Sequence, residues 1–522
     1  MAYKPTIGLE IHAELNTNSK MFCSCKNDPD EKRPNFNICP ICAGHPGTLP
    51  VANEEAIKKV IKTGLSLNCK IAEDSKFDRK NYFYPDLPKG YQISQYDKPL
   101  CLGGFLEIHQ DKSQIPNPKS QKNSNDQNSK FKKIRITRIH LEEDTGSLIH
   151  PEGAAPKLAF GDPGSRSQSD LGNYSLVNLN RAGIPLMELV TEPDITSGKE
   201  AREFAEELQL ILKYLGVSNA DMEKGQMRVE VNISLSKTKK FGTKVEIKNL
   251  NSFKVVEKAI DFEIKRQEEI LESGEKIAQE TRGWHDKKEI TFSQREKEEA
   301  HDYRYFPEPD LPSMHFNKNF IEEIKAIMPE LPAQKRERFK KQYGLDSDSI
   351  GFFVTNKDLS EYFEKVISEF EEWLKTEGIK GGEKLYKLVA NYLISDVKGL
   401  LCDKPFIETE FKITPENFAE FVKMIYKGEI SSKIAKMVLI NMFNTGIDPS
   451  TVVDENNWRQ MSDDLELEKI VKEVVAKNPK AVDDYKSGKQ NSLQFLAGQI
   501  MVVTRGTAKP DKVHNLLNKL LN

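Results

Sequence analysis

Residues alternate between apolar and polar in short stretches from the N-terminus to about residue 294, and turn-forming residues separate these stretches. In residues 6–15 every second residue is apolar, and Glu10 and His12 fall between the apolar ones. A period of two is typical of a half-buried strand, so we expect Glu10 and His12 on the same polar face. The same alternation predicts strands in residues 226–235 and 242–250, which we expect to pair as a hairpin.

One helix in this part of the sequence has clear signals at both ends. Residues 197–200 read Ser-Gly-Lys-Glu, a capping box, and Gly216 is suited to the C-terminal stop. Between them, apolar residues recur three and four positions apart as far as Leu215, as on the buried side of an amphipathic helix. Several strands with this one clear helix predict an α+β domain with a mixed or antiparallel sheet.

Helical spacing replaces the alternation from about residue 295 onward. Apolar residues recur three and four positions apart in residues 320–328, 360–374 and 384–401. Polar breaks that contain proline, at residues 402–405 and 414–415, indicate where a last helical module begins. We therefore expect three domains: an α+β domain over residues 1–294, an all-α domain over residues 295–405 and an all-α tail over residues 406–522.

The composition is that of a folded protein with several domains. The chain has 522 residues, of which 38% are hydrophobic, enough to build more than one packed core. Its 77 Lys and Arg residues nearly balance 80 Asp and Glu residues, so contact with a nucleic acid would depend on local patches rather than on net charge. No stretch is long and apolar enough to cross a membrane, and the first residues lack the features of a signal or transit peptide, so we expect a cytoplasmic protein.

A polar stretch interrupts the predicted strands. Residues 111–130 contain Ile115 as their one strong hydrophobe. Such a segment cannot contribute to a core, so it is expected to be an exposed loop inserted between two strands, without a catalytic part.

Four of the seven cysteines form a C-x-C pair followed by a C-x-x-C pair, and they are Cys23, Cys25, Cys39 and Cys42. Two close pairs of thiolates are typical of a tetrahedral zinc site. Because four thiolates fill the coordination shell, the zinc would be structural and would fold the intervening chain into a small knuckle. The alternative is four reduced cysteines in an irregular loop.

The polar sides of the predicted strands carry many carboxylates. They are Glu10, Glu142, Glu143, Asp144, Glu188, Glu192, Glu230 and Glu246, with His12 and His140 among them. Several carboxylates on one side of a sheet repel one another unless a hard cation lies between them, and Mg²⁺ with a nucleotide phosphate is the usual occupant. The alternative is a solvated strand face.

Arg and Lys residues between these acids are candidates for binding an anionic ligand, because they match the charge and donor geometry of phosphates. They are Arg79, Lys80, Arg138, Arg181, Arg228, Lys244, Lys248, Arg282 and Arg304, each with surface solvation as the alternative. Aromatic residues cluster in residues 81–86 and 301–307, where rings are suited to stacking on a base, or to packing under a turn. The sequence has no GxxxxGK[ST] motif, no GxSxG motif and no Gly/Ser-rich amidase nucleophile segment.

Longer motifs run through nearly the whole chain in a fixed order. They are IGLEIH at 7–12, the cysteine group, NYFYPDLPKGYQIS at 81–94, HLEEDTG at 140–146, NRAGIPLME at 180–188, TEPD at 191–194, GTKVEIKN at 242–249, QETR at 279–282 and KEEAHDYRYFPEPD at 297–310. In this combination the sequence resembles the B-subunit family of the aspartyl/glutamyl-tRNA(Asn/Gln) amidotransferases, within the GatB/GatE group.

The resemblance implies a cradle-like catalytic domain, a helical linker domain and a tail similar to small tRNA-binding proteins. It also implies an ATP-dependent ligase that forms a C–N bond. Such an enzyme phosphorylates the side-chain carboxylate of Glu on tRNA(Gln) or Asp on tRNA(Asn), and ammonia then displaces the phosphate. The implied cofactors are ATP, Mg²⁺ and structural Zn²⁺. The implied partners are a glutaminase A subunit, a small C subunit and the misacylated tRNA, with no membrane involved.

The resemblance also assigns roles to individual residues. Catalysis is expected from Glu10, His12, Glu142, Glu143 and Glu188, and the Mg²⁺ ligands among them are expected to be Glu10, His12, Glu142 and Glu188. Nucleotide contacts are expected from Arg181, Lys244, Lys248 and Arg282. The sequence departs from the family pattern at Asn178, where Asp is usual, and at Val229-Glu230, where Cys-Asp is usual, so neither Asn178 nor Glu230 is among the leading metal candidates.

The end of the chain has a local basic excess that suits a tRNA backbone, although solvated helix ends would produce the same composition. The basic residues are Lys486, Lys489, Arg505, Lys509, Lys512 and Lys519. Two other functions stay open at this point. One is a zinc-containing RNA-binding module without catalysis, which leaves the acidic face unexplained. The other is a nucleotide-dependent ligase that acts alone on a free carboxylate substrate.

Overall fold

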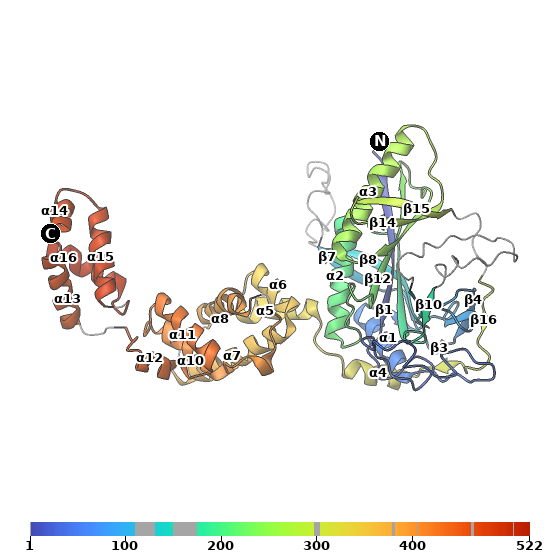
Figure 1. Ribbon diagram of the computed structural model, residues 1–522, viewed down its shortest axis with the longest axis horizontal. Coiled ribbons are helices and arrows are strands. Elements are labelled where there is room, and N and C mark those ends of the chain that lie inside the picture. Colours follow the sequence, from blue (N-terminus) through green and yellow to red (C-terminus); the bar gives the residue numbers. More distant parts are fainter. Residues whose placement is uncertain are drawn as a thin grey trace, which may run out of the picture. The chain divides into compact units, whose positions relative to one another are not determined.

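The computed structural model describes residues 2–109, 131–149, 175–296, 303–377, 382–402, 404–460, 464–504 and 506–521. The loop expected over residues 111–130 lies outside them. The chain divides into two compact units, Met1–Leu331 and Pro332–Asn522 (Figure 1).

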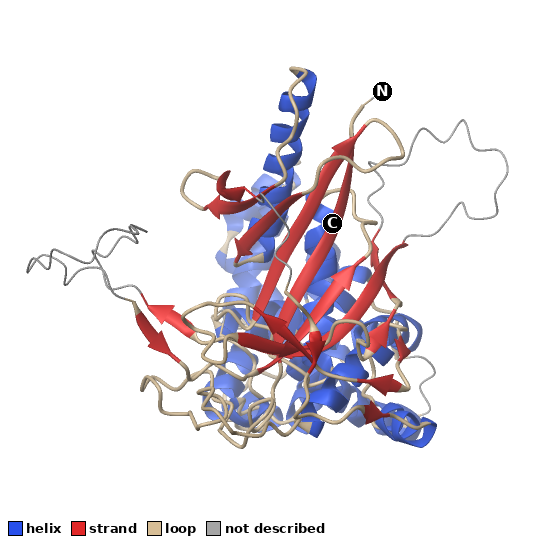
Figure 2. Ribbon diagram, turned by 90° about the vertical axis from the view of Figure 1, so that its right-hand side faces the viewer, coloured by secondary structure: helices blue, strands red, loops and turns tan. Residues whose placement is uncertain are grey.

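A ten-stranded sheet forms the centre of the first unit (Figure 2). Its strand order is β15-β14-β13-β12-β1-β11-β8-β6-β2, and β7 pairs with β8. The strands are β1 (Lys4–Glu14), β2 (Lys70–Ile71), β6 (Cys101–Leu102), β7 (Phe105–His109), β8 (Phe131–Glu143), β11 (Pro185–Thr191), β12 (Met227–Ser236), β13 (Val245–Leu250), β14 (Glu280–His285) and β15 (Ile290–Glu296). The β13–β14 pair is parallel and the other pairs are antiparallel, so the sheet is mixed, as predicted.

Shorter strands form three small sheets in the same unit. They are β4 (Asp78–Asn81), β5 (Tyr91–Ser94) and β16 (Phe306–Pro307) in one sheet, β3 (Asp74–Ser75) and β17 (Met314–His315) in a second, and β9 (Ser147–Ile149) and β10 (Leu176–Asn178) in a third. Strand β5 contacts β8, so the first of these sheets lies against the central sheet.

Helices cover one face of the central sheet. They include α2 (Gly198–Tyr214) and α3 (Phe253–Glu272), which pack against each other and against the strands (Figure 1). The other helices of this unit are α1 (Glu54–Ser66) and α4 (Lys318–Ala326). The core lies between these layers, because the apolar residues of β1 are fully buried together with Phe204 and Leu208 of α2.

The predicted strands and the predicted helix of this unit are confirmed. The alternating segments form β1, β12 and β13, and β12 pairs with β13 in antiparallel register. Helix α2 begins where the capping box placed it, because the Ser197 side chain accepts a hydrogen bond from the Glu200 amide. The expectation of one helix before residue 294 is wrong, since α1 and α3 also lie there. The buried side of α3 includes the polar residues Glu263 and Gln267, which interrupt the apolar spacing.

The first unit extends past residue 294, where the α+β domain was expected to end. Residues after this position form β16 and β17, which pair with β4 and β3 respectively. These pairings join the segment to strands near the N-terminus, and the first compact unit continues to Leu331.

The second unit is helical, as predicted. Its helices are α5 (Pro332–Tyr343), α6 (Ser347–Thr355), α7 (Lys357–Thr376), α8 (Glu383–Asn391), α9 (Lys398–Leu401), α10 (Pro415–Tyr426), α11 (Ser432–Thr445), α12 (Pro449–Glu455), α13 (Asp464–Lys477), α14 (Pro479–Lys486), α15 (Asn491–Val503) and α16 (Pro510–Leu521). A π-helical turn (η4, Tyr392–Val397) joins α8 to α9, and a 3₁₀ turn (η5, Glu408–Glu410) follows α9. Helices α13 to α16 share an apolar core of their own around Val471, Leu496 and Leu517.

Among the described helices, none combines the length with the apolar composition that crossing a membrane requires.

Candidate active site and metal centres

Cross-strand register gathers the acidic face of the sheet at its central strands. His12 of β1 lies opposite Glu188 of β11, and Glu188 lies opposite His140 of β8. Glu10 precedes His12 by two residues, and Glu142 follows His140 by two, so all five side chains share one face. We call these five residues the acidic cluster. The alternation in each strand fixes the face, and the pairing of three strands brings the side chains together.

The side chains of the acidic cluster converge on a small volume. His12 Nε2 lies 3.4 Å from Glu188 Oε2, 3.8 Å from Glu142 Oε1 and 3.9 Å from Glu10 Oε1. His140 Nε2 lies 3.4 Å from Glu188 Oε2 and 3.8 Å from Glu142 Oε2. Two sets of ligand atoms, from Glu10, His12 and Glu188 and from His140, Glu142 and Glu188, each lie within 4.8 Å of one another.

This geometry fits a divalent cation. The donor set is mainly carboxylate oxygen, which hard cations prefer. The Nδ1 atoms of His12 and His140 are buried and have no hydrogen-bond partner among the described residues, so either imidazole is available to a further ligand. We conclude that the residues present can hold a metal ion between β1, β8 and β11.

Shifts in pKa show how strongly the charged groups of the acidic cluster interact with one another. Burial lowers the pKa of His12, but its hydrogen bond to Glu188 and the charges of Glu188 and Glu142 outweigh burial and raise the pKa to about 9. Burial raises the pKa of Glu188, but His140 and His12 reverse this effect, and the pKa falls below its ordinary value. The pKa of Glu10 is raised by burial and by the charges of Glu188 and Glu230. A cation among these groups would relieve the repulsion.

The small sheet of β4, β5 and β16 supplies residues beside the acidic cluster. Ser94 at the end of β5 donates a 3.0 Å hydrogen bond to Glu142 Oε2. Lys80 on β4 is half-buried; burial lowers its pKa, but the charges of Glu142, Tyr305 and Glu188 outweigh burial and raise the pKa above its ordinary value. Lys80 therefore places a persistent positive charge next to the carboxylates. Ser94 ends the motif at residues 81–94 but was given no role, whereas Lys80 was one of the basic candidates.

The structure does not bring Glu143 into the acidic cluster. Its carboxylate pairs with Lys89 and accepts a 2.9 Å hydrogen bond from the Ile93 amide. Glu142 and Glu143 are neighbours on β8, so their side chains point to opposite faces of the strand.

Arg181 belongs to a second charged group beside the acidic cluster. It lies 2.6 Å from Asp144 and 2.9 Å from Glu14, and Arg228 lies 3.2 Å from Asp144. Burial raises the pKa of Asp144, but the charges of Arg228 and Arg181 lower it below its ordinary value. The predicted nucleotide contact Arg181 is thus engaged with two carboxylates.

The other predicted nucleotide contacts lie in three different surroundings. Lys248 is 2.8 Å from Glu230 and 3.6 Å from Glu246, on the same face as Glu10. Lys244 is exposed, one residue before β13 begins. Arg282 lies opposite Ile247, whose side chain is in the core, and therefore faces α3 rather than the acidic cluster.

Arg282 is held in a buried ionic network on the helix side of the sheet. Its guanidinium donates to Glu280 at 2.5 Å and to the Thr291 hydroxyl at 2.9 Å, and it lies 3.5 Å from Glu263 of α3. Glu263 is fully buried and also pairs with Arg266 at 2.6 Å. This network links α3 to β14 and β15.

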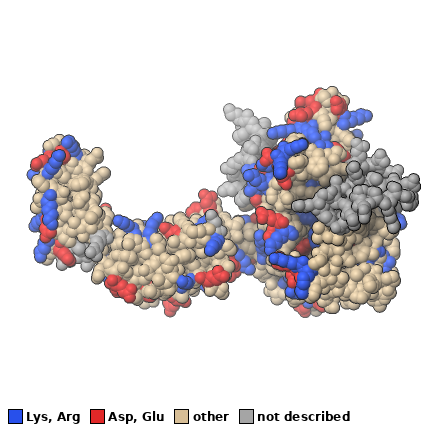
Figure 3. Space-filling view, viewed as in Figure 1, with Lys and Arg blue, Asp and Glu red and all other residues tan. Residues whose placement is uncertain are grey.

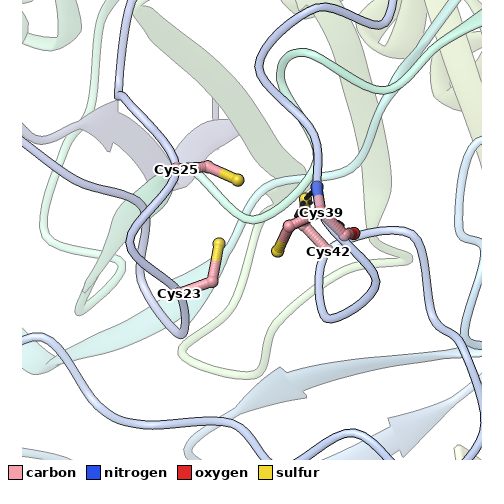
Figure 4. Close-up of side chains that lie close together, drawn as sticks. All are labelled: Cys23, Cys25, Cys39 and Cys42. Atoms are coloured by element: carbon pink, nitrogen blue, oxygen red, sulfur yellow. Dashed lines mark hydrogen bonds between the residues drawn. The ribbon is translucent and has the colours of Figure 1, made fainter.

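The four cysteines form a second candidate metal centre. The sulfur atoms of Cys23, Cys25, Cys39 and Cys42 lie within 4.8 Å of one another and face a common space (Figure 4). The Cys39 amide donates a 3.1 Å hydrogen bond to Cys42 Sγ, which is the arrangement that stabilises a thiolate. Four sulfur donors at this spacing fit a tetrahedral zinc ion.

A fully buried lysine lies beside the cysteines. Lys20 Nζ is 3.7 Å from Cys42 Sγ and donates a 3.3 Å hydrogen bond to the Leu179 carbonyl. Four thiolates together with a divalent ion would have a net charge of −2. The Lys20 side chain would offset part of that charge. Lys20 had no signal in the sequence, because its partners are distant in the chain.

The cysteine-containing segment is tied to the loop that carries Arg181. Asn180 Oδ1 accepts hydrogen bonds from the amides of Phe36 and Asn37 at 2.7 and 3.0 Å, and Asn180 Nδ2 donates to the Arg33 carbonyl at 2.7 Å. Asn178, one of the departures from the expected pattern, accepts a hydrogen bond from the Asn35 amide at 3.2 Å. The other departure, Glu230, pairs with Lys248 opposite Glu10.

Comparison with known proteins matches both units. The family described as the GatB/GatE catalytic domain matches residues 5–322, and the GatB domain family matches residues 369–521. Full-length relatives are named as the B subunit of aspartyl/glutamyl-tRNA(Asn/Gln) amidotransferase. The protein of Persephonella marina is 46% identical over 523 aligned residues, which cover 100% of both chains. That of Thermotoga maritima is 45% identical over 100% of this chain and 99% of its own.

Proposed function

The chain belongs to the B-subunit family of the aspartyl/glutamyl-tRNA(Asn/Gln) amidotransferases, and on that premise we propose that it converts misacylated Glu-tRNA(Gln), Asp-tRNA(Asn) or both into the correct amide. As a carboxylate is a poor electrophile, the reaction needs ATP to phosphorylate the side-chain carboxyl group. Ammonia then attacks the acyl carbon and expels phosphate, which completes a C–N ligation.

The acidic cluster is the observation that carries this proposal. Glu10, His12, Glu142 and Glu188 would hold Mg²⁺, which when bound neutralises charge on the transferring phosphoryl group. His140 lies 3.4 Å from Glu188 and orients that carboxylate. Lys80 carries a persistent positive charge beside the same carboxylates, where it would attract the nucleotide phosphates.

Basic residues around the acidic cluster are proposed to complete the nucleotide site. Lys248 lies on the same face as Glu10, and Arg181 sits beside the neighbouring Asp144. An incoming phosphate would compete with their present carboxylate partners. Lys244 and Arg282 have weaker support, because Lys244 is exposed outside β13 and Arg282 faces α3.

The four cysteines are proposed to bind one structural zinc ion. Their sulfur atoms already lie within 4.8 Å of one another, and a closed shell of four thiolates leaves no position for a reacting water. The zinc would fix the segment that Asn180 joins to the Arg181 loop.

Partner subunits are proposed to supply ammonia. The sequence has no amidase nucleophile segment, so a glutaminase A subunit would release ammonia, and a small C subunit would join the two. Ammonia must reach the acyl phosphate without being protonated by bulk water, which requires an enclosed path between the subunits. The three proteins would work in the cytoplasm on charged tRNA.

The tail over residues 406–522 is proposed to bind the tRNA backbone. Lys and Arg side chains follow an edge of the C-terminal helices in Figure 3. Of the six basic residues predicted to contact tRNA, the structure describes Lys486, Lys489, Lys509, Lys512 and Lys519. Lys489 pairs with Asp484 at 2.8 Å, and Arg505 lies outside the described residues.

The test is an amidation assay with the chain and its A and C partner subunits, given ATP, glutamine and either Glu-tRNA(Gln) or Asp-tRNA(Asn). We expect ADP to form faster when charged tRNA is present. Glu142→Gln should lower the amidation rate at least about a hundredfold, whereas Glu107→Gln, at an exposed side chain on β7 of the same sheet, should not. The absence of tRNA-stimulated ADP formation by the complete wild-type complex would refute the proposed function.

A further inference from the structure

Four tyrosines form a continuous row across the small sheet that contacts the acidic cluster. The ring centroids of Tyr82 and Tyr303 are 5.9 Å apart, and those of Tyr303 and Tyr305 are also 5.9 Å apart. Tyr305 then stacks face to face on Tyr96, with the centroids at 4.1 Å and the planes at 8°. We call these four residues the tyrosine row. The proposed function gives none of them a role.

The tyrosine row lies beside the acidic cluster, because Ser94, two residues before Tyr96, donates a 3.0 Å hydrogen bond to Glu142. Lys80 Nζ is 5.1 Å from the ring centroid of Tyr303 and 5.9 Å from that of Tyr82. Burial raises the pKa of Tyr305 to about 12, and the charges of Glu142 and Glu188 add to the rise while Lys80 opposes it. Tyr305 is therefore within electrostatic reach of the carboxylates that would hold the metal.

The outer end of the row is open to solvent. Tyr96 is 60% exposed although Tyr305 covers one face of its ring, so the exposed area lies mainly on the other face and the ring edges. The Tyr96 backbone is fixed, because its amide donates a 3.1 Å hydrogen bond to the buried Asp78 carboxylate. A flat, fixed and solvent-facing aromatic ring is the surface on which nucleobases stack.

Resting on the proposed function, we infer that the open face of Tyr96 stacks on the adenine of the 3′-terminal adenosine of charged tRNA while its aminoacyl group extends along the row to the acidic cluster. The terminal adenosine carries the amino acid on its ribose, so the base and the side-chain carboxylate that reacts are separated by a short chain of bonds. Tyr305 backs the ring and connects the two positions.

Exposed rings next to the row favour a single-stranded tRNA end over the adenine of ATP as the occupant. Phe83 is 83% exposed, Tyr84 is 59% exposed and Phe306 is 43% exposed, all on the segments that carry the tyrosine row. A nucleotide has one base and needs one platform. The unpaired end of a tRNA has several successive bases, and several exposed rings suit their stacking.

The test compares Tyr96→Ala, Tyr96→Leu and Tyr96→Phe in the complete three-subunit enzyme, with separate titrations of charged tRNA and ATP. Loss of one base stack should raise KM for charged tRNA about 5- to 100-fold in the Ala and Leu variants, with KM for ATP unchanged. The Phe variant retains the ring and should stay within about twofold of wild type. The Leu variant fills the space without a π-face, so it separates stacking from packing.

Two outcomes would overturn this inference. A rise in KM for ATP without a rise for charged tRNA would assign the ring to the nucleotide, and unchanged constants in the Ala and Leu variants would remove it from the site. Either result requires an active wild-type complex, so it is distinct from failure of the proposed function, in which the wild type itself shows no tRNA-stimulated ADP formation.

Discussion

Replacing Arg282 with Met tests whether this arginine stabilises the fold or binds nucleotide. The guanidinium joins β14, β15 and α3, and its removal leaves the fully buried Glu263 with fewer partners. Breaking a buried ion pair from one side costs about 3–5 kcal/mol. Arg266 lies 2.6 Å from Glu263 and is not removed by the substitution, so we expect the lower end, a loss of about 3 kcal/mol in the free energy of unfolding.

The assay is urea unfolding followed by tryptophan fluorescence. Trp284 lies on β14, two residues from Arg282, and the other two tryptophans, Trp373 and Trp458, lie in the second unit. A background with both of those changed to Phe therefore reports on the first unit alone. The matched control is Arg202→Met, because Arg202 forms its pairs with Glu206 and Glu257 at the surface and should cost less than about 1 kcal/mol.

A nucleotide role for Arg282 would give a different result. If Arg282→Met raised KM for ATP about tenfold or more while the free energy of unfolding changed by less than about 0.5 kcal/mol, the structural reasoning would be refuted. Arg282 would then contact a nucleotide phosphate, and its ion pairs with Glu280 and Glu263 would not stabilise the fold.

Four further predictions concern the two candidate metal centres and the hydrogen bonds of Asn180. Cys39→Ser should remove most of the bound zinc measured by elemental analysis, while Cys402→Ser, at an exposed cysteine outside the cluster, should retain it; equal zinc in both variants would refute the site. Lys20→Met should weaken zinc retention about tenfold in a chelator competition, because the buried charge beside Cys42 is lost, and unchanged retention would contradict the assigned charge balance. Asn180→Ala should lower the free energy of unfolding by about 1–3 kcal/mol, since two backbone amides lose their acceptor, and undiminished stability in urea would show that the contacts are dispensable. Glu188→Gln should lower kcat at least about a hundredfold and raise the Mg²⁺ concentration needed for half-maximal rate, and a normal magnesium titration would exclude it as a ligand.

The strands and the cysteine cluster were predictable because their signals are local. Alternation places Glu10 and His12 on one side of β1, and spacing alone indicated that the four cysteines gather. The partners of these strands were not predictable in the same way. Strand β1 lies between β11 and β12, which come much later in the chain, and only that pairing sets His12 opposite Glu188.

Some differences between expectation and structure follow from strand geometry that the sequence already contained. Glu142 and Glu143 are adjacent on one strand, so they cannot both face the acidic cluster. The same alternation separates Arg282 from Thr281, whose hydroxyl donates to Glu246 on the acidic face. By contrast, the buried Glu263 of α3 interrupts the apolar spacing, and its partners include the distant Arg282 as well as its helix neighbour Arg266.

The hydrogen bonds of Asn180 connect the segment that contains the four cysteines to the loop that carries Arg181. Oxidation of these thiols would release the segment that includes Phe36 and Asn37, and with it the support of the turn preceding Arg181. Damage of this kind would disturb alignment at the carboxylates while leaving the ten-stranded core folded.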